Sequence, residues 1–462
     1  SLHDALPISY SESFARIADR VGMLVVNELT DKWSDNDYWG GRQPFTHLWH
    51  KLITEWIKRD RNRPSIILWS LGNELQIREG WAGFEGTNDW GITTYNIFNQ
   101  LVKRWDHTRL TTVAMFPARA GAITRHDKEF NDYLVPPELA CATEVASFNY
   151  QSDKYDAYLK YQPDLILFQS EAETSKLLQP YYNMDRKRTV GMAYWGSAEY
   201  WGESNKWPKK GWNYSFFDHT MRPYPQAYLI KSAFMPEIPE VHIGVVDAAG
   251  AESVSWNDVT VGRMALNECW NHIPGSRQSL FTYTNAHSVE LLVNGQSMGV
   301  QQNDTTQANL RNMIYWKDVP YGNGGSVVAI ARDKSGKEVA RHRIETAGKA
   351  VALQIETETP ADWKADGMDL QYINVTAIDK KGRPVWDYNE PLTLQMEGAA
   401  RLVALDNGDH YTDELFQGIT SKRMYQGRMQ IILRSTKTPS NVKLKISSAD
   451  LKEKLSLKTF LK

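Results

Sequence analysis

The chain has 462 residues, which is more than one ordinary domain contains, so two or three domains are expected. Its formal net charge is −2 with 23% charged residues, which gives no electrostatic argument for nucleic acid or an acidic membrane as a partner. No run of about 18 apolar residues is present to span a membrane. Cys141 and Cys269 support neither a disulfide framework nor a zinc site, and the common metal, phosphate and dinucleotide motifs are missing, so we expect no metal and no cofactor.

Residues 1–235 alternate short apolar strands with amphipathic helices. Helical spacing of apolar residues is clearest in residues 47–60 and 95–105. Such alternation predicts a parallel sheet with right-handed crossovers, either open or closed into a barrel. The expected strands are residues 22–27, 65–71, 110–116, 144–150, 164–170 and 190–196.

Two of these strands end in a glutamate. Glu74 follows the unbroken apolar run 66–68, and Glu171 follows the run 165–168. Parallel α/β barrels place their chemistry at such strand ends, where a low-dielectric rim raises the pKa of a carboxylic acid. Two carboxyl groups facing one pocket are what glycoside hydrolysis requires. The alternative is that each glutamate is only a polar strand cap, and the occurrence of two such strand ends makes this less favoured.

Aromatic residues supply candidate pocket walls. Twelve of the 17 tryptophans precede residue 213, and most of them are expected to pack in the core. Trp195, at the end of a strand, and Trp201, just beyond it, are better placed to face the apolar side of a sugar ring.

After residue 236 helical periodicity disappears and short strands follow one another. Residues 281–284 and 289–293 are typical strands, and Asn294-Gly295 is a strong hairpin signal. The run of strands is interrupted near Ala347-Gly348, which marks a module boundary, and strands resume at about residue 353. This pattern predicts two β-sandwich modules of roughly 100 residues each. The expected domains are therefore residues 1–235, 236–347 and 348–462.

These motifs resemble those of glycoside hydrolase family 2, which includes β-galactosidases, β-mannosidases and β-glucuronidases. The resemblance rests on the runs 59–65 (Arg-Asp-Arg-Asn-Arg-Pro-Ser) and 69–74 (Trp-Ser-Leu-Gly-Asn-Glu), with Arg63 where the family usually has histidine. It implies that Glu74 is the acid/base and that Asn73 binds the sugar 2-hydroxyl. The weaker sandwich motifs also match, so the resemblance covers nearly the whole chain from about residue 9.

Later strand ends carry further implied site residues. Ser170-Glu171 matches the nucleophile motif of the family, and Asn149-Tyr150 matches the preceding strand end, with Tyr150 bonded to the nucleophile. The last barrel strand of the family carries tryptophan followed by an acidic residue, an aromatic residue and Gly-Glu. Here that pattern is represented by Trp195, Glu199, Tyr200, Gly202 and Glu203. Taken over all strand ends, the resemblance implies the following substrate-binding residues: Asn73, Asn149, Tyr150, Trp195, Glu199 and Trp201.

The resemblance implies a fold and a reaction. The fold is a (β/α)8-type barrel lacking its first strands, followed by two immunoglobulin-like β-sandwiches. The reaction is exo-acting, retaining hydrolysis of terminal β-linked neutral sugars. The Asn-x-Lys motif that β-glucuronidases carry after the last barrel strand is not found there, which favours a neutral sugar, and β-galactosides are the leading substrates. β-Mannosidase, β-glucuronidase and a non-catalytic carbohydrate-binding protein with a degenerate barrel remain alternatives.

Six barrel strands are counted where the family has eight. We expect the first two strands, a jelly-roll domain and an immunoglobulin-like domain to lie upstream, and the chain alone to be poorly folded or inactive. An open sheet of this kind would expose edges and apolar side chains. A periplasmic or extracellular location is expected from the polysaccharide-degrading role of the family. The sequence does not indicate an oligomeric state.

Other candidates carry less weight. Glu28 ends the first strand and either lines the pocket or plays a structural part, which is slightly favoured. Glu173 is expected to support the nucleophile rather than react. The acidic loop 406–414 does not fit a calcium-binding pattern and is interpreted as a solvated turn. His219 and Tyr214 follow the last strand, and the sequence does not decide their role.

Overall fold

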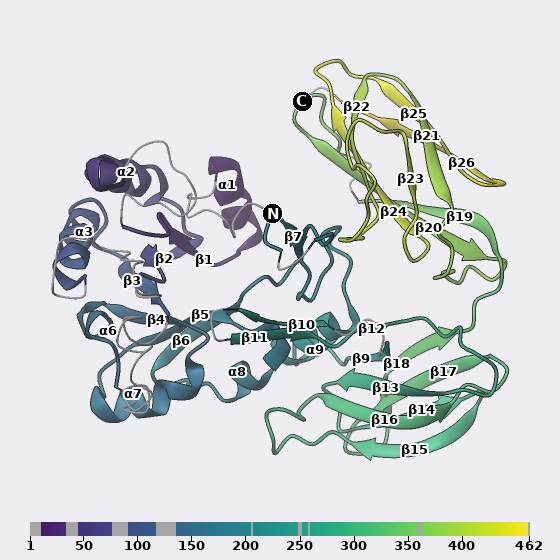
Figure 1. Cartoon of the computed structure of the whole chain (residues 1–462), viewed down its shortest axis with the longest axis horizontal. Helices are drawn as coiled ribbons and strands as arrows, with labels where there is room; N and C mark the ends of the chain where they lie inside the picture. The colour runs from purple at the N-terminus through teal and green to yellow at the C-terminus, as the bar shows by residue number, and fades with distance from the viewer. Residues whose placement is uncertain are drawn as a thin grey trace. The chain divides into compact units, whose positions relative to one another are not determined.

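The computed structural model describes residues 11–33, 45–75, 91–116, 135–204, 207–247, 252–256, 259–358 and 362–460 (Figure 1). The chain divides into two compact units. The first comprises Ser1–Ser197 with Ser255–Val261, and the second comprises Ala198–Val254 with Gly262–Lys462. Within the described residues, no helix is both long and apolar enough to cross a membrane.

A parallel six-stranded sheet forms the centre of the first unit. The strands lie side by side in sequence order, from β1 to β6. This confirms the predicted strand–helix alternation, although the strand ends shift by up to a few residues. The strands are β1 (Val25–Glu28), β2 (Ile66–Asn73), β3 (Leu110–Met115), β4 (Val145–Asn149), β5 (Leu167–Ala172) and β6 (Thr189–Tyr194).

Helices connect successive strands, as right-handed parallel crossovers require. Figure 1 shows α2, α3, α6 and α7 following one side of the sheet. The α-helices are α1 (Glu12–Val21), α2 (Phe45–Asp60), α3 (Ile92–Trp105), α6 (Glu138–Ala142), α7 (Tyr155–Tyr161) and α8 (Gln179–Tyr182), and the short 3₁₀-helices are η1 (Ser152–Lys154) and η2 (Thr174–Lys176).

Buried aromatic residues fix α2 and α3 against the sheet. Trp69 of β2 is fully buried and meets Trp56 of α2 edge to face, with ring centroids 4.8 Å apart. Its indole Nε1–H donates to Asp106 Oδ2 over 2.9 Å, so the ring brings no unsatisfied donor into the core. Two apolar side chains of the sheet, Ile67 of β2 and Val190 of β6, are 47% and 64% exposed.

The second unit begins with a small hairpin and one helix. These elements are β7 (Tyr200–Trp201), β8 (Gly211–Trp212) and α9 (Pro225–Phe234). A separate two-stranded sheet is formed by β10 (Glu252–Trp256) and β11 (Val259–Arg263).

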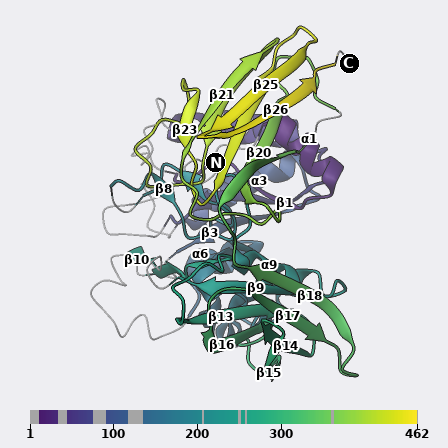
Figure 2. The same ribbon diagram turned by 90° about the vertical axis from the view of Figure 1, so that its right-hand side faces the viewer.

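Two β-sandwiches make up the rest of the second unit, as the sequence predicts, and each encloses its own apolar core (Figure 2). The first pairs the sheet β12-β9-β13-β16 with the sheet β15-β14-β17-β18. Its strands are β9 (Val241–Val246), β12 (Leu266–Asn267), β13 (Arg277–Thr284), β14 (Ser288–Val293), β15 (Gln296–Gln302), β16 (Met313–Pro320), β17 (Ser326–Arg332) and β18 (Glu338–Glu345).

The second sandwich pairs the sheet β19-β20-β24-β22 with the sheet β23-β21-β25-β26. Its strands are β19 (Ala350–Thr357), β20 (Leu370–Asp379), β21 (Pro391–Glu397), β22 (Ala400–Asp406), β23 (Ser421–Arg423), β24 (Arg428–Ser435), β25 (Asn441–Ser448) and β26 (Leu451–Lys458). The predicted module boundaries at residues 235 and 347 remain predictions.

Local sequence explains the hairpin predicted in the first sandwich. Asn294 and Gly295 join β14 to β15 and have φ angles of 51° and 83°. Both central residues of a type I′ turn need positive φ, and asparagine followed by glycine adopts it at the lowest cost.

The sandwich core allows a matched test of stability. Leu433 of β24 is fully buried, whereas Leu415 of the same module is 67% exposed. Leu433→Ala is expected to lower the free energy of unfolding by about 2–5 kcal/mol, because the cavity adds to the lost transfer energy. Leu415→Ala should change it by less than about 0.5 kcal/mol. Urea unfolding of the two variants measures the difference, and equal losses would contradict the packing described.

Candidate active site

The two predicted glutamates lie at the same edge of the parallel sheet. Glu74 directly follows β2, and Glu171 lies near the end of β5. All strands of the sheet run in one direction, so their carboxyl ends gather at one edge, where α/β folds place their sites.

The backbone is bent at two of these strand ends. Glu74 has a φ of 47° and Tyr150 has a φ of 62°, a left-handed conformation uncommon for residues other than glycine. Each is held by a backbone hydrogen bond to the next strand: Glu74 N donates to Ala114 O and Tyr150 N donates to Glu171 O, both over 2.7 Å. Backbone strain of this kind persists only where the surrounding contacts fix the conformation, and it is common at functional sites.

The amide of Asn149 connects Glu74 to its neighbours. Asn149 is fully buried at the end of β4, and its Nδ2 donates to Glu74 Oε1 and to Asn73 Oδ1, each over 3.0 Å. Its Oδ1 accepts from the hydroxyl of Ser170 over 2.7 Å, which fixes the orientation of the amide. The structure therefore brings the predicted residues Asn73, Glu74 and Asn149 together.

Asn73 is held from the opposite side by residues that follow β1. Its Nδ2 donates to Asp31 Oδ1 over 3.2 Å, and Lys32 Nζ donates to both Asp31 Oδ1 (2.6 Å) and the carbonyl oxygen of Asn73 (2.8 Å). Sequence reasoning missed Asp31 and Lys32. Their position just beyond the end of β1 was the signal that could have found them.

The hydroxyl of Tyr150 donates a hydrogen bond to Glu171 Oε2. This is the contact that the family resemblance implies for the nucleophile. The ring of Tyr150 meets Phe116 edge to face, with centroids 5.8 Å apart, so the phenol is held on two sides. A hydroxyl donor favours the ionised form of a carboxyl group, which is the form that can attack.

Glu28 adds a third carboxyl group beside Glu74. It accepts from the hydroxyl of Ser70 over 2.6 Å. Burial raises the pKa of Glu28 to about 7, against the effect of the Ser70 hydrogen bond, and the negative charges of Asp31 and Glu74 raise it further. Glu28 is thus electrostatically coupled to the candidate acid/base.

Two other residues of the first unit lie close to the end of β5. Glu173 is buried and pairs with Lys176 Nζ over 2.8 Å, which suits the supporting part expected of it. Trp195 follows β6, and its backbone N–H donates to Ala172 O over 3.0 Å. The role of Trp195 in substrate binding remains a prediction.

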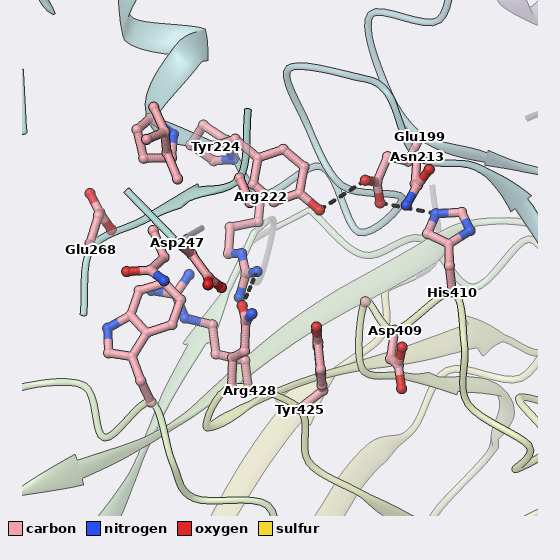
Figure 3. A pocket seen from close by; sticks show the side chains of 18 of the residues that line it. Glu199, Asn213, Arg222, Tyr224, Asp247, Glu268, Asp409, His410, Tyr425 and Arg428 are labelled. Atoms are coloured by element: carbon pink, nitrogen blue, oxygen red, sulfur yellow. Dashed lines mark hydrogen bonds and ion pairs between the residues drawn. The ribbon is translucent and has the colours of Figure 1, made fainter. Parts of the chain in front are cut away.

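Glu199 and Trp201 belong to the second unit. Glu199 is buried, and its carboxylate accepts from Tyr224 OH over 2.9 Å and contacts His410 Nε2 at 3.0 Å (Figure 3). The ring of Trp201 lies against His219 and His410, with centroids 4.4 and 4.7 Å apart. Their substrate-binding role also remains a prediction.

The acidic loop is not simply a solvated turn. Asp406 is only 8% exposed and lies 2.7 Å from His219 Nε2, so the expectation is wrong for this residue. Because the partner is 187 positions away in sequence, local spacing could not reveal it. A polar cavity of about 150 Å³ lies nearby within the second unit, lined among others by Glu199, Arg222, Tyr224 and His410 (Figure 3).

Comparison with protein families gives three matches. A family model described as "Glycosyl hydrolases family 2, TIM barrel domain" matches residues 9–189, and "Glycoside hydrolase family 2 C-terminal domain 5" matches residues 353–455. Residues 275–340 match a "Domain of unknown function (DUF4982)". The first match begins where the resemblance in motifs begins.

Individual relatives that match most of the chain point to the same family. The chain is 24% identical to "Beta-galactosidase BoGH2A" of Bacteroides ovatus, over 95% of the chain and 54% of that protein. It is 24% identical to a "Putative beta-glucuronidase" of Formosa agariphila, over 92% of the chain and 42% of that protein. A solved family 2 glycosyl hydrolase from Bacteroides cellulosilyticus superposes with a TM-score of 0.81 at 24% identity. The superposition covers 97% of this chain and 56% of the solved chain. The chain thus spans about half the length of these relatives.

The pKa of Glu28 generates a prediction on stability. Because the folded-state pKa of about 7 lies above the ordinary value of 4.5, the folded chain binds more protons than the unfolded chain between these values. Stability should therefore fall as pH rises through that window, by on the order of 1–3 kcal/mol. Glu28→Gln should remove most of this slope, and the exposed Glu55→Gln should keep it.

Urea unfolding between pH 4.5 and pH 8 measures both variants beside the unchanged chain. A slope that persists in Glu28→Gln would show that Glu28 is not the group responsible.

Proposed function

Because the chain belongs to glycoside hydrolase family 2, we propose that it carries the catalytic carboxyl groups of an exo-acting β-glycosidase. The enzyme would release terminal β-linked sugars from oligo- or polysaccharides with retention of configuration. One observation supports this above the others. Glu74 and Glu171 lie at the same edge of one sheet, and consecutive residues of the strand end between them, Asn149 and Tyr150, each hydrogen-bond one of the two glutamates.

The roles follow from the chemistry of retaining hydrolysis. A carboxylate oxygen of Glu171 forms a bond to the anomeric carbon while the bond from that carbon to the leaving oxygen breaks, and Glu74 gives its proton to the leaving oxygen. Glu74 then takes a proton from water, whose oxygen attacks the same carbon and releases Glu171. Two inversions leave the configuration of the sugar unchanged.

The partners of each glutamate fit its proposed role. Glu171 receives the Tyr150 hydroxyl hydrogen, which stabilises the anion that must attack. Glu74 lies beside Glu28, whose pKa is raised by burial and by the negative charges of Asp31 and Glu74, so one proton is favoured on Glu28 next to Glu74. Asn73, held by Asp31 and Lys32, is positioned to bind a sugar hydroxyl.

β-Galactosides are the proposed substrates. No Asn-x-Lys motif directly follows the last barrel strand, which favours a neutral sugar, and a relative that matches 95% of the chain is named a β-galactosidase. β-Glucuronides are the second candidate, because another relative over most of the chain is named a putative β-glucuronidase. A panel of nitrophenyl β-galactoside, β-glucuronide and β-mannoside discriminates among them.

Replacement of the two glutamates should give different kinetic patterns. In a protein of the relatives' length that contains this chain, Glu171→Gln should abolish turnover of every glycoside. Glu74→Gln should slow poor leaving groups by about 10²–10⁴-fold but affect dinitrophenolate release much less, because that leaving group needs no proton. Glu55→Gln is the control. Full activity of Glu171→Gln, or binding of sugar without turnover by the unchanged protein, would contradict the proposal.

Tyr150 should act through Glu171. Tyr150→Phe keeps the ring against Phe116 but removes the hydroxyl donor. A hydrogen bond to a charged group contributes about 1.5–3 kcal/mol, so kcat/KM should fall by roughly 10–100-fold. Steady-state kinetics on the nitrophenyl substrate measure this, with Tyr161→Phe, an exposed tyrosine, as control. An unchanged kcat/KM would mean that this hydrogen bond does not assist the reaction.

A further inference from the structure

Three side chains of the second unit bring potential ligand atoms to one point. Glu199 Oε2 lies 3.0 Å from His410 Nε2, His410 Nε2 lies 3.2 Å from His219 Nδ1, and His219 Nδ1 lies 3.7 Å from Glu199 Oε2. All three side chains are buried, with 3% or less of each exposed. Atoms at this distance are linked either by a hydrogen on one imidazole nitrogen, since a neutral imidazole carries one N–H donor and one lone pair, or by a bound cation.

Asp406 determines which nitrogen of His219 faces the cluster as a lone pair. His219 Nε2 lies 2.7 Å from Asp406 Oδ1, and an ionised carboxylate can only accept a hydrogen bond. The hydrogen of neutral His219 therefore resides on Nε2, and Nδ1 points its lone pair at the other two atoms. A carboxylate behind a ligating histidine is the usual arrangement in metal sites, where it fixes the ring and its tautomer.

The separations also have the size that a metal ion requires. A point equidistant from three atoms so arranged lies about 2 Å from each, and Zn–N and Zn–O bonds are about 2.0–2.2 Å long. Tetrahedral ligands at that distance lie about 3.3 Å apart. We propose that Glu199, His219 and His410 form a binding site for a divalent transition-metal ion of the zinc class, with Asp406 as the outer partner of His219.

Two imidazoles and one carboxylate select this class of ion. Nitrogen donors favour zinc and its neighbours over magnesium or calcium, which prefer all-oxygen sites. Glu199 and His410 also line the cavity of about 150 Å³, which offers an ion and a water ligand a route to the fourth position (Figure 3). Trp201 packs on both histidines, so the far side of the cluster is apolar.

A second histidine cluster in the same unit provides a contrast. His242 and His342 stack face to face with centroids 3.9 Å apart, and His342 Nδ1 accepts from the backbone N–H of Ile243. His342 Nε2 lies 3.9 Å from Glu268, compared with 2.6 Å for His242 Nε2. The wider separation between His342 Nε2 and Glu268 Oε1, and the backbone donor on His342 Nδ1, fit a shared ion less well than the first cluster does. This cluster therefore supplies a control with the same kinds of side chain.

The proposed ion would join distant segments of the chain. Glu199 precedes β7, His219 follows β8, and His410 follows β22 of the C-terminal sandwich, 211 positions after Glu199. Metal binding to a folded site contributes directly to folding, because the unfolded chain has no preformed site. The role is structural and does not depend on the activity proposed above, so its test uses no substrate.

The first experiment measures metal binding by the whole chain. After removal of metals with a chelator, cobalt(II) is titrated into the protein, and the visible absorption bands of tetrahedral cobalt report the site. One ion per chain is expected, and zinc should displace it. Zinc at about 100 times its dissociation constant should also raise Tm by roughly 3–5 °C. No tetrahedral cobalt spectrum together with no zinc-dependent rise in Tm would overturn the proposal and leave hydrogen bonds as the link among the three side chains.

Variants then locate the ion. His219→Gln and His410→Gln should each abolish the cobalt spectrum and the zinc-dependent rise in Tm, and His342→Gln should keep both. A spectrum that survives in His219→Gln and His410→Gln, or disappears in His342→Gln, would overturn the assignment. If either variant fails to fold, Glu199→Gln supplies the missing test, because it removes one proposed ligand and keeps the size of the side chain. Cobalt binding that is unchanged in Glu199→Gln would overturn the assignment.

Discussion

Asn149 is completely buried, and its side-chain amide joins residues from three strand ends. Its Nδ2 donates to Asn73 and Glu74 beyond β2, and its Oδ1 accepts from Ser170 of β5. A buried amide that lost one of these partners would cost about 1–3 kcal/mol. Two consecutive residues at the end of β4 therefore position the two candidate glutamates, because the amide of Asn149 bonds Glu74 and the hydroxyl of Tyr150 bonds Glu171.

The bent strand ends are maintained by the packing beneath them. Positive φ at Glu74 and Tyr150 costs on the order of 1–3 kcal/mol for each residue. Backbone hydrogen bonds to Ala114 and Glu171 hold the two bends, and the buried ring of Trp69 with its bond to Asp106 anchors β2 below them. Consequently, the sheet rather than the loops determines the direction in which the side chains of Glu74 and Tyr150 point.

Much of this arrangement could be predicted from local sequence, and the reason is physical. Apolar runs that end in Asn73-Glu74 and Ser170-Glu171 reveal strands and their carboxyl ends, because a buried parallel strand needs an unbroken apolar run. The sandwiches were predictable from period-two strands and from turns such as Asn294-Gly295. What could not be predicted are contacts that only the fold creates. His410 meets Glu199 across 211 positions, and Asp406 meets His219 across 187.

A pair of carboxyl groups can serve as acid and nucleophile only if their surroundings separate their protonation states. On the side of β1 and β2, burial and the negative charges of Asp31 and Glu74 raise the pKa of Glu28, against the opposing charge of Lys32, so a proton is retained on Glu28 beside Glu74. On the side of β4 and β5, a hydroxyl donor favours the anion of Glu171. The asymmetry is created by the kind of partner at each strand end, so exchange of the two roles would require exchange of those partners as well.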